Sequence, residues 1–434
     1  MITDKLKEGT SDSVKYMCDE ITHICNDLPK RAPGSEGEKI ACEYMAEQLQ
    51  GLSDDVKMES FKLNPSAFMG WVYITVTCIL LAFVCYFFAT MVSLVLIVVA
   101  IIPMLLQFIF YMRALDPLYK EKTSYNVTAV KKCSGEVKQR IFYNGHVDAA
   151  NEWSTSFHFN GTFLIVHFLL AMVGIVYLFA IDIARWVNVG MIGAGIAEGT
   201  YLYLGLAGIV FIPVWFLWYF FSNPKVVVDG ANDNLTGCYM GIAILKALKD
   251  NDIDLKNTEV GVIITGSEEA GLRGAKAWSE AHKGEYQDVP TYIFAYDTIH
   301  DGEFFQINRK DLNGFVKSNT EACDMFAKAA KDIDVRCLEG IVPFGATDGA
   351  AFNKGGFKCA SITALNHNLQ KYYHTRLDTA DNMDEKCLAD CYKVSVQLLS
   401  QFEDVKEMSN DTQVENVSTE QIDVESASTE SADI

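Results

Sequence analysis

The stretch IITGSEEAGLRGAK, residues 263–276, decides how this chain is interpreted, because it places two glutamates directly after an apolar run. The run that ends in Ile263 and Ile264 is typical of a buried strand. Glu268 and Glu269 then stand side by side, although adjacent carboxylates repel each other unless a positive charge neutralises one of them. An isolated pair of this kind is usually a solvated turn, so the rest of the chain must decide between that interpretation and a functional site.

The segments outside the longest apolar runs follow an alternating pattern of strands and helices. Period-two and buried apolar runs predict strands over 56–63, 125–130, 140–148, 259–266, 291–298 and 359–365. Helical spacing predicts a turn followed by a helix over 31–49 and a helix over 233–250. Strands that alternate with helices indicate an α/β fold with a mostly parallel sheet covered on both faces.

Two long apolar regions interrupt this pattern. The 50 residues from Leu63 to Met112 contain no Asp, Glu, Lys or Arg, and 153–181 and 199–224 also lack these charges. A bilayer core is spanned by about 20 apolar residues, so we expect four transmembrane helices near 68–88, 91–112, 160–181 and 200–221. Each pair leaves and returns on one side, which predicts two hairpins inserted into one domain. The expected division is a discontinuous domain (1–62, 113–159 and 225–402), two hairpins (63–112 and 160–224) and a disordered acidic tail (403–434).

Charge and cysteine usage indicate the compartment. Near the span ends, the side that carries both termini has nine basic residues, whereas the opposite side has Arg185 alone. The positive-inside rule therefore predicts a multi-pass integral protein of the cell membrane with its termini and soluble segments in the cytoplasm. The 12 cysteines are scattered, as expected for reduced thiols. A net charge of −20 argues against a nucleic-acid partner.

Five polar clusters lie at or just beyond the predicted strand ends, where functional groups gather in parallel sheets. They are NGHVDAA with His146 and Asp148, DGANDNLTG with Asp233, GSEEAG with Glu268 and Glu269, AYDT with Asp297, and YYHTRLDT with His374. Two divalent ions held close together need a bridging carboxylate with nitrogen and oxygen ligands on each side. Imidazole and carboxylate without thiolate suit zinc in a hydrolytic site.

In this order the clusters resemble the dizinc exopeptidases that include bacterial leucyl aminopeptidase, aminopeptidase Y and glutamate carboxypeptidase II. The resemblance covers 14–62, 123–160 and 225–402, and it extends to RAPGSEGE and GATDGAAFNKGGFKCASITAL. It implies a three-layer α/β/α zinc-exopeptidase-like domain with a mostly parallel mixed sheet. To this domain the apolar regions add four transmembrane α-helices, inserted as two hairpins.

The resemblance also implies a ligand set. His146 and Asp297 would bind one Zn²⁺ ion, Glu269 and His374 would bind the second, and Asp233 would bridge the two ions. Mn²⁺ or Co²⁺ could replace zinc at such ligands.

The remaining motif residues receive supporting roles from the same resemblance. Glu268 would be the general base that activates water beside the metals, and Asp148 would accept the second ring N–H of His146. Gly230 and Gly237 would let the backbone turn tightly around Asp233, which Asn234 follows. Tyr373 and Asp348 are weaker candidates, either for the substrate pocket or for contacts that support the metal ligands.

We therefore expect a membrane-anchored zinc metallopeptidase, an aminopeptidase that hydrolyses N-terminal residues from short peptides. Its expected partners are a peptide substrate and the lipid bilayer, and the sequence specifies no oligomeric state. Two alternatives stay open: a carboxypeptidase or dipeptidase on the same site, or a catalytically silent membrane scaffold with a peptidase-like domain. The complete ligand set argues against the scaffold and against a single-zinc glutaminyl cyclase. The insertion between Asp148 and Asp233 further predicts that the hairpins orient the cleft near the bilayer surface.

Overall fold

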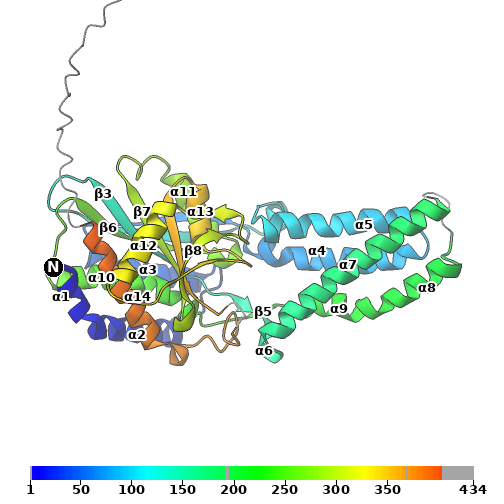
Figure 1. Cartoon of the computed structure of the whole chain (residues 1–434), viewed down its shortest axis with the longest axis horizontal. Helices are drawn as coiled ribbons and strands as arrows, with labels where there is room; N and C mark the ends of the chain where they lie inside the picture. Colours follow the sequence, from blue (N-terminus) through cyan, green and yellow to red (C-terminus); the bar gives the residue numbers. More distant parts are fainter. Residues whose placement is uncertain (1, 191–194, 367–369, 403–434) are drawn as a thin grey trace, which may run out of the picture.

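A computed structural model of the chain describes residues 2–190, 195–366 and 370–402. An α/β domain forms one end of the molecule, and a bundle of long helices projects from it (Figure 1). The predicted acidic tail, 403–434, lies outside the described residues.

The core of the α/β domain is one mixed sheet in the order β1-β2-β6-β3-β7-β11-β8-β10, with β9 paired to β8. The strands are β1 (Asp55–Leu63), β2 (Lys122–Lys131), β3 (Gln139–His146), β6 (Thr258–Thr265), β7 (Thr291–Ile299), β8 (Phe305–Asp311), β9 (Val316–Lys317), β10 (Leu338–Ile341) and β11 (Lys358–Ala364). The central strands β6, β3, β7 and β11 run parallel, whereas β1 and β2 add antiparallel pairs at one edge and β8 pairs antiparallel with β11.

Helices cover both faces of this sheet. One face carries α1 (Ile2–Glu8), α2 (Thr10–Asp27), α3 (Glu36–Gln50), α10 (Thr236–Asp250), α12 (Thr320–Asp332) and α14 (Glu385–Leu398). The other face carries α11 (Arg273–Ala281) and α13 (Asp348–Lys354). The expected three-layer α/β/α architecture with a mixed sheet is therefore confirmed.

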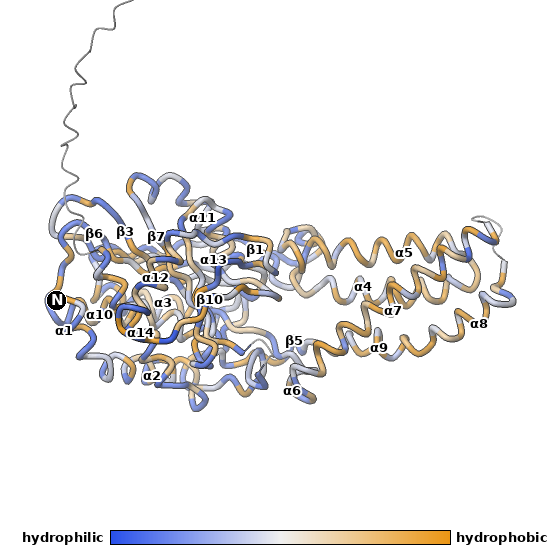
Figure 2. Tube along the Cα trace, viewed as in Figure 1, coloured by the Kyte–Doolittle hydropathy of each residue, from blue (hydrophilic) through white to orange (hydrophobic). Residues whose placement is uncertain are grey.

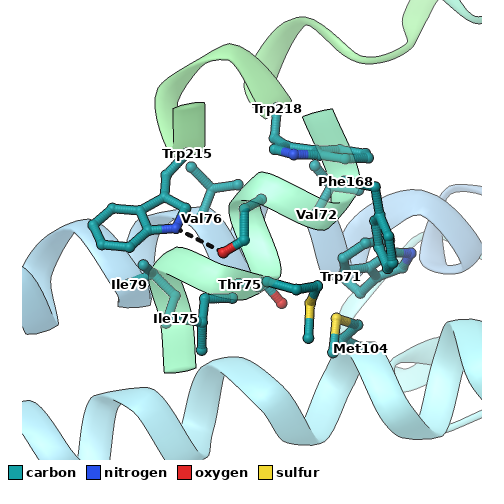
Figure 3. Close-up of a pocket in the computed structure, with 12 residues that line it drawn as sticks. Trp71, Val72, Thr75, Val76, Ile79, Met104, Phe168, Ile175, Trp215 and Trp218 are labelled. Carbon is teal, nitrogen blue, oxygen red and sulfur yellow. Dashed lines mark hydrogen bonds between the residues drawn. The ribbon is translucent and has the colours of Figure 1, made fainter. Parts of the chain in front are cut away.

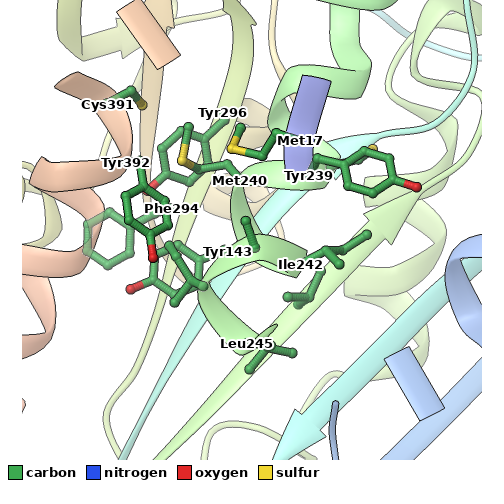
Figure 4. Packing of buried hydrophobic residues seen from close by; sticks show 14 of the residues in the cluster. Met17, Tyr143, Tyr239, Met240, Ile242, Leu245, Phe294, Tyr296, Cys391 and Tyr392 are labelled. Carbon is green, nitrogen blue, oxygen red and sulfur yellow. The ribbon is translucent and has the colours of Figure 1, made fainter. Parts of the chain in front are cut away.

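Alternate residues of the central strands serve the two cores, because successive side chains of a strand point to opposite faces. Tyr143 of β3 and Phe294 of β7 contribute to the larger core, which Figure 4 shows packed against Met17 of α2 and Met240 of α10. Phe142 of β3, one residue before Tyr143, faces the smaller core under α11 and α13.

The projecting helices form two hairpins. The first hairpin consists of α4 (Pro65–Tyr86), α5 (Thr90–Pro103) and η1 (Met104–Ile109). The second consists of α7 (Gly161–Val189), α8 (Gly199–Ala207), η3 (Gly208–Phe211), α9 (Ile212–Leu217) and η4 (Trp218–Phe220). Four helical segments are long and apolar enough to cross a membrane: Pro65–Tyr86, Thr90–Ile109, Gly161–Val189 and Gly199–Phe220. Figure 2 shows their hydrophobic character along the whole bundle.

Both hairpins leave the domain between paired strands. The first connects β1 to β2, whose ends pair at Leu63 and Lys122. The second follows β4 (Asn151–Glu152) and α6 (Ser154–His158), and the chain returns through β5 (Asn223–Val227), which pairs antiparallel with β4.

The two hairpins pack against each other through aromatic side chains. Figure 3 shows an apolar cavity where they meet, lined by residues that include Trp71, Met104, Phe168 and Trp215. Its volume is about 30 Å³. The indole Nε1–H of Trp215 donates to the main-chain oxygen of Ala171 at 3.1 Å and joins two of the helices.

Candidate metal centre

The residues predicted to bind metal meet at the carboxyl ends of the central strands. His146 ends β3, and Asp297 lies near the end of β7. Glu268 and Glu269 begin η6 (Glu268–Ala270), a short turn directly after β6. Parallel neighbours bring their carboxyl ends to one edge of the sheet, so residues up to 151 positions apart come together.

The protonation state of His146 is set by its neighbours. Its Nδ1 lies 3.2 Å from the main-chain oxygen of Asp148 and 3.5 Å from the Asp148 carboxylate. A carbonyl oxygen can only accept, so Nδ1 carries the proton and Nε2 presents its lone pair to the site. That Nε2 is buried and has no hydrogen-bond partner among the described residues, as expected of a metal ligand.

Asp148 takes a different contact from the one expected from the sequence. Its two carboxylate oxygens accept the main-chain N–H groups of Glu268 at 2.9 Å and Glu269 at 3.0 Å. Two backbone donors direct the carboxylate towards the turn, which leaves the main-chain oxygen of Asp148 closer to the His146 ring. Asp148 therefore orients the glutamate turn with its side chain and the histidine with its backbone.

Asp233 lies between the two histidines. Its Oδ1 is 3.3 Å from Nε2 of His146, and its Oδ2 is 2.9 Å from Nε2 of His374. Asp233 belongs to η5 (Ala231–Leu235), which begins after Gly230 in the left-handed region at φ +59°. A Cβ on Gly230 would approach the main-chain oxygen of Asp233 to 2.6 Å, so the turn requires glycine. Gly230 thus has the tight-turn role that the sequence predicted.

The residues after Asp233 fix its position. The peptide bond between Asp233 and Asn234 is cis. The side-chain amide of Asn234 donates to the main-chain oxygen of Tyr296 at 2.7 Å and accepts from the N–H of Gly237 at 3.1 Å. A Cβ on Gly237 would lie 2.5 Å from that same amide oxygen, which explains the second glycine.

His374 faces both Asp233 and Glu269. Its Nε2 is 3.1 Å from Oε1 of Glu269, in addition to the contact with Asp233. The ring of Tyr373 stacks on the imidazole with centroids 4.1 Å apart, and the indole of Trp153 meets it edge-on at 4.4 Å. Two aromatic rings therefore restrict the orientation of this imidazole.

The potential ligand atoms form two triads that share one residue. The first triad is His146, Asp233 and Asp297, and the second is Asp233, Glu269 and His374; within each triad the atoms lie within 4.8 Å of one another. A third combination, His146 with Glu268 and Glu269, overlaps both. The two triads are the predicted ligand sets, and their chemistry, imidazole with carboxylate, fits zinc.

The electrostatics of the cluster also fit cations. Burial raises the pKa of Glu268 well above its usual range against the lowering effect of His146, and the charge of Glu269 raises it further. Burial and the charge of Asp233 likewise raise the pKa of Asp297. Carboxylates crowded out of water in this way are stabilised in their charged form by positive ions, so the pocket suits divalent metals.

The two weaker sequence candidates lie beside the cluster. Asp348 accepts the hydroxyl of Thr265 at the end of β6, and burial raises its pKa to about 6. Asp348 therefore stabilises the end of β6 through Thr265. Tyr373 is partly exposed and stacks on His374, so it remains a candidate for the substrate pocket.

Three residues that support the site lie in the quoted motifs but received no role from the sequence. Arg31, 1% exposed, donates to the main-chain oxygens of Val147 and Asp229 at 2.7 and 2.6 Å. Glu38 accepts the hydroxyl of Ser267 at 2.7 Å, directly before the glutamate pair. Asp378 accepts the N–H of Asp233 at 3.1 Å. The signal that could have identified these three residues is their position in the motifs RAPGSEGE and YYHTRLDT. Their hydrogen bonds to the site could not be predicted, because these bonds depend on the fold.

An α/β/α fold with two His–carboxylate triads that share one aspartate defines a class of protein, the metallo-exopeptidases. Residues 219–399 match the family model described as peptidase family M28. The resemblance to the dizinc exopeptidases, and the expected metallo-exopeptidase class of enzyme, are thereby confirmed. A comparison with curated protein sequences gives no match.

Solved structures with the same fold include several aminopeptidases. An aminopeptidase from Aneurinibacillus sp. strain AM-1 aligns with a TM-score of 0.56 at 13% identity, over 92% of this chain and 95% of its own. A zinc aminopeptidase from Bacillus subtilis aligns with a TM-score of 0.54 at 12% identity, over 90% of this chain and 95% of its own. LapB from Legionella pneumophila aligns with a TM-score of 0.53 at 11% identity, over 92% of this chain and 74% of its own. At these identities the likeness establishes the fold.

Proposed function

We propose that this chain is a membrane-anchored aminopeptidase that holds two zinc ions and hydrolyses N-terminal residues from short peptides. The observation that carries the proposal is the pair of triads around Asp233, because one shared carboxylate between two mixed nitrogen and oxygen sets is the arrangement that two neighbouring divalent ions require. Manganese or cobalt at the same ligands remains compatible with this arrangement.

The division of labour follows from the positions of the side chains. Zinc, when bound, would polarise the scissile carbonyl and lower the pKa of water towards about 7. Glu268 is 8% exposed, and its Oε2 lies 3.9 Å from Nε2 of His146. Its carboxylate is placed to accept the proton of the attacking water and to return it to the leaving amine. Asp148 holds the backbone of Glu268 in place for this transfer.

The charge of the site supports a substrate with a free amino group. Five carboxylates meet here: Asp148, Asp233, Glu268, Glu269 and Asp297. Two divalent ions would neutralise four of these charges, so a negative excess would remain and attract an ammonium group. This polarity favours an aminopeptidase over a carboxypeptidase, which must bind a carboxylate. A dipeptidase stays the nearest alternative.

The proposed location is the cell membrane with the catalytic domain in the cytoplasm. The proposal rests on four helices that are long and apolar enough to span a bilayer, and on the excess of Lys and Arg near the domain side of these helices. The bilayer and the peptide substrate are the proposed partners. The glutaminyl cyclase from an Acidobacteriales bacterium shares the fold with a TM-score of 0.50, but the two complete triads favour peptide hydrolysis.

The experiment follows amino-acid release from short peptides with free or acetylated N-termini. Detergent-purified full-length protein is compared with Glu268→Gln, and bound zinc is measured in both. Cleavage of the free peptides alone, absent in the variant, supports the proposal. Inactive protein that carries two zinc ions would favour a carboxypeptidase or dipeptidase, and protein with neither zinc nor activity would favour the scaffold.

A further inference from the structure

The turn that carries the two glutamates adopts an unfavourable backbone. Ser267 has φ +55° and Leu272 has φ +60°, both in the left-handed region, and Gly271 between them has φ +96°. Non-glycine residues in this region cost free energy and persist where surrounding contacts fix them. The contacts of this turn therefore determine where the carboxylates of Glu268 and Glu269 stand.

Arg273 supplies the first of these contacts. Its side chain is buried, with 2% exposure, at the start of α11. Its Nε donates to the main-chain oxygen of Ala270 in the glutamate turn at 3.0 Å. Its Nη2 donates to the carboxylate of Asp116 at 2.7 Å, and Asp116 lies in η2 (Asp116–Leu118), just after the first hairpin. One guanidinium thus joins the turn to the hairpin base.

Lys276, one turn later on α11, repeats the arrangement. Its Nζ donates to the main-chain oxygen of Gly271 at 2.8 Å and to the main-chain oxygen of Tyr111 at 2.6 Å. Tyr111 directly follows the first hairpin and is 8% exposed. Two basic side chains of one helix therefore each bind one carbonyl of the glutamate turn and one group of the segment 111–116.

An apolar contact completes the connection. A Cβ on Gly271 would lie 2.8 Å from Cδ2 of Phe68, which belongs to the first turn of α4. The rings of Phe68 and Tyr111 have centroids 4.9 Å apart, and both side chains share a buried cluster with Leu272. Phe68 lies where the chain enters the first hairpin, and Tyr111 lies where it leaves. Both ends of this hairpin therefore pack near the glutamate turn.

We propose that the base of the first hairpin positions the Glu268–Glu269 turn, with Arg273 and Lys276 as the positioning residues. Turnover then depends on how the hairpin is seated, and displacement of the hairpin moves the general base and a metal ligand together. The inference rests on the proposed function for its kinetic consequence, whereas its consequence for zinc binding does not require that peptides be the substrate.

The experiment breaks each connection on the hairpin side or on the helix side. Asp116→Ala removes the carboxylate that binds Arg273. Lys276→Met removes both hydrogen bonds of Nζ and keeps a side chain of similar length. Glu121→Ala is the matched control, since Glu121 pairs with Lys62 at 3.7 Å on the same juxtahairpin segment but its side chain is 59% exposed. Zinc affinity is measured by competition with a chromophoric chelator, and kcat and KM are measured on a free peptide in detergent.

We expect kcat to fall by about tenfold or more in Asp116→Ala and Lys276→Met, since small displacements of catalytic groups are costly, while KM changes less than about twofold. Zinc affinity should fall roughly tenfold in both, because Glu269 moves with the turn. Glu121→Ala should match the wild type. Unchanged kcat and unchanged zinc affinity in both variants would overturn the positioning role, as would a lower thermal midpoint with kcat intact. If wild type cleaves no peptide but both variants lose zinc affinity, the proposed function fails and the positioning role stands.

Discussion

The indole of Trp153 lies edge-on against the imidazole of His374, with ring centroids 4.4 Å apart and planes at 78°. The main-chain N–H of Trp153 also donates to the main-chain oxygen of His374 at 2.8 Å. The indole also contacts Phe221, where the second hairpin ends, with centroids 5.1 Å apart. The second hairpin therefore reaches the candidate ligand His374 through Trp153, whereas the first hairpin contacts the turn that carries Glu269.

This contact predicts that Trp153→Leu weakens zinc binding. Leucine keeps the backbone hydrogen bond but removes the ring that restricts the imidazole, and loss of such supporting contacts typically costs about 10–100-fold in metal affinity or activity. The measurement is zinc affinity by chelator competition. Trp186→Leu serves as a control, because Trp186 is 37% exposed and lies in the last turn of α7. Equal zinc affinity in wild type and Trp153→Leu would contradict the prediction.

The two adjacent glutamates should behave differently on substitution. Glu268→Gln should abolish turnover, by about 10²–10⁴-fold for a general base, and should leave bound zinc near the wild-type amount. Glu269→Ala and His374→Ala should lose zinc as well as activity, since each removes a ligand of the second triad. Zinc content by elemental analysis and kcat on one peptide separate the roles. Equal zinc loss in all three variants would show that Glu268 is a ligand.

The stability of the protein should depend on the titration of Glu38. Burial raises the pKa of Glu38 to about 8 from its usual 4.5, and the charge of Asp148 adds to the effect. The folded state holds this proton more tightly than the unfolded chain, so the stabilisation is complete below pH 4.5 and is lost as the pH rises through about 8.

Glu38→Gln keeps a neutral side chain at every pH. We expect its thermal midpoint, relative to that of the wild type, to increase between about pH 4.5 and 8 and to level off above that. Thermal scans of chelator-treated protein across this range provide the measurement, and Glu36→Gln is the control, since Glu36 is exposed on the first turn of α3. A constant difference in midpoint across the range would rule out this titration.

The second hairpin should influence which peptides are cleaved. Its end at Phe221 packs on Trp153, which contacts His374, and α4 of the first hairpin contacts the glutamate turn, so the metal centre faces the hairpins. Replacing 160–221 with a short Gly-Ser linker, which can preserve the β4–β5 pairing, should lower the turnover of vesicle-bound peptides relative to soluble ones. Unchanged folding and unchanged peptide selectivity would refute the idea that the hairpins favour substrates delivered at the bilayer.

The central part of the fold was predictable because its signals are local. The strands around Ile141 and Ile263 are continuously apolar, as expected for parallel strands that are buried on both faces of the sheet. The long uncharged runs identify the hairpin helices. The strands β8 and β10, at one end of the sheet, were not predicted. Gln306 and Lys310 lie within β8 and Glu339 lies within β10, so the apolar pattern is weak in both strands.

The sequence by itself determined which side chains can bind metal and in what order they occur, because ligand chemistry depends on residue type. Tertiary structure alone decided that the carboxylate of Asp148 holds the glutamate turn, that Trp153 packs on His374, and that Lys276 binds Tyr111. The physical reason is that such contacts join residues more than 100 positions apart, whose approach is set by the packing of whole helices and strands and leaves no periodic signal in the chain.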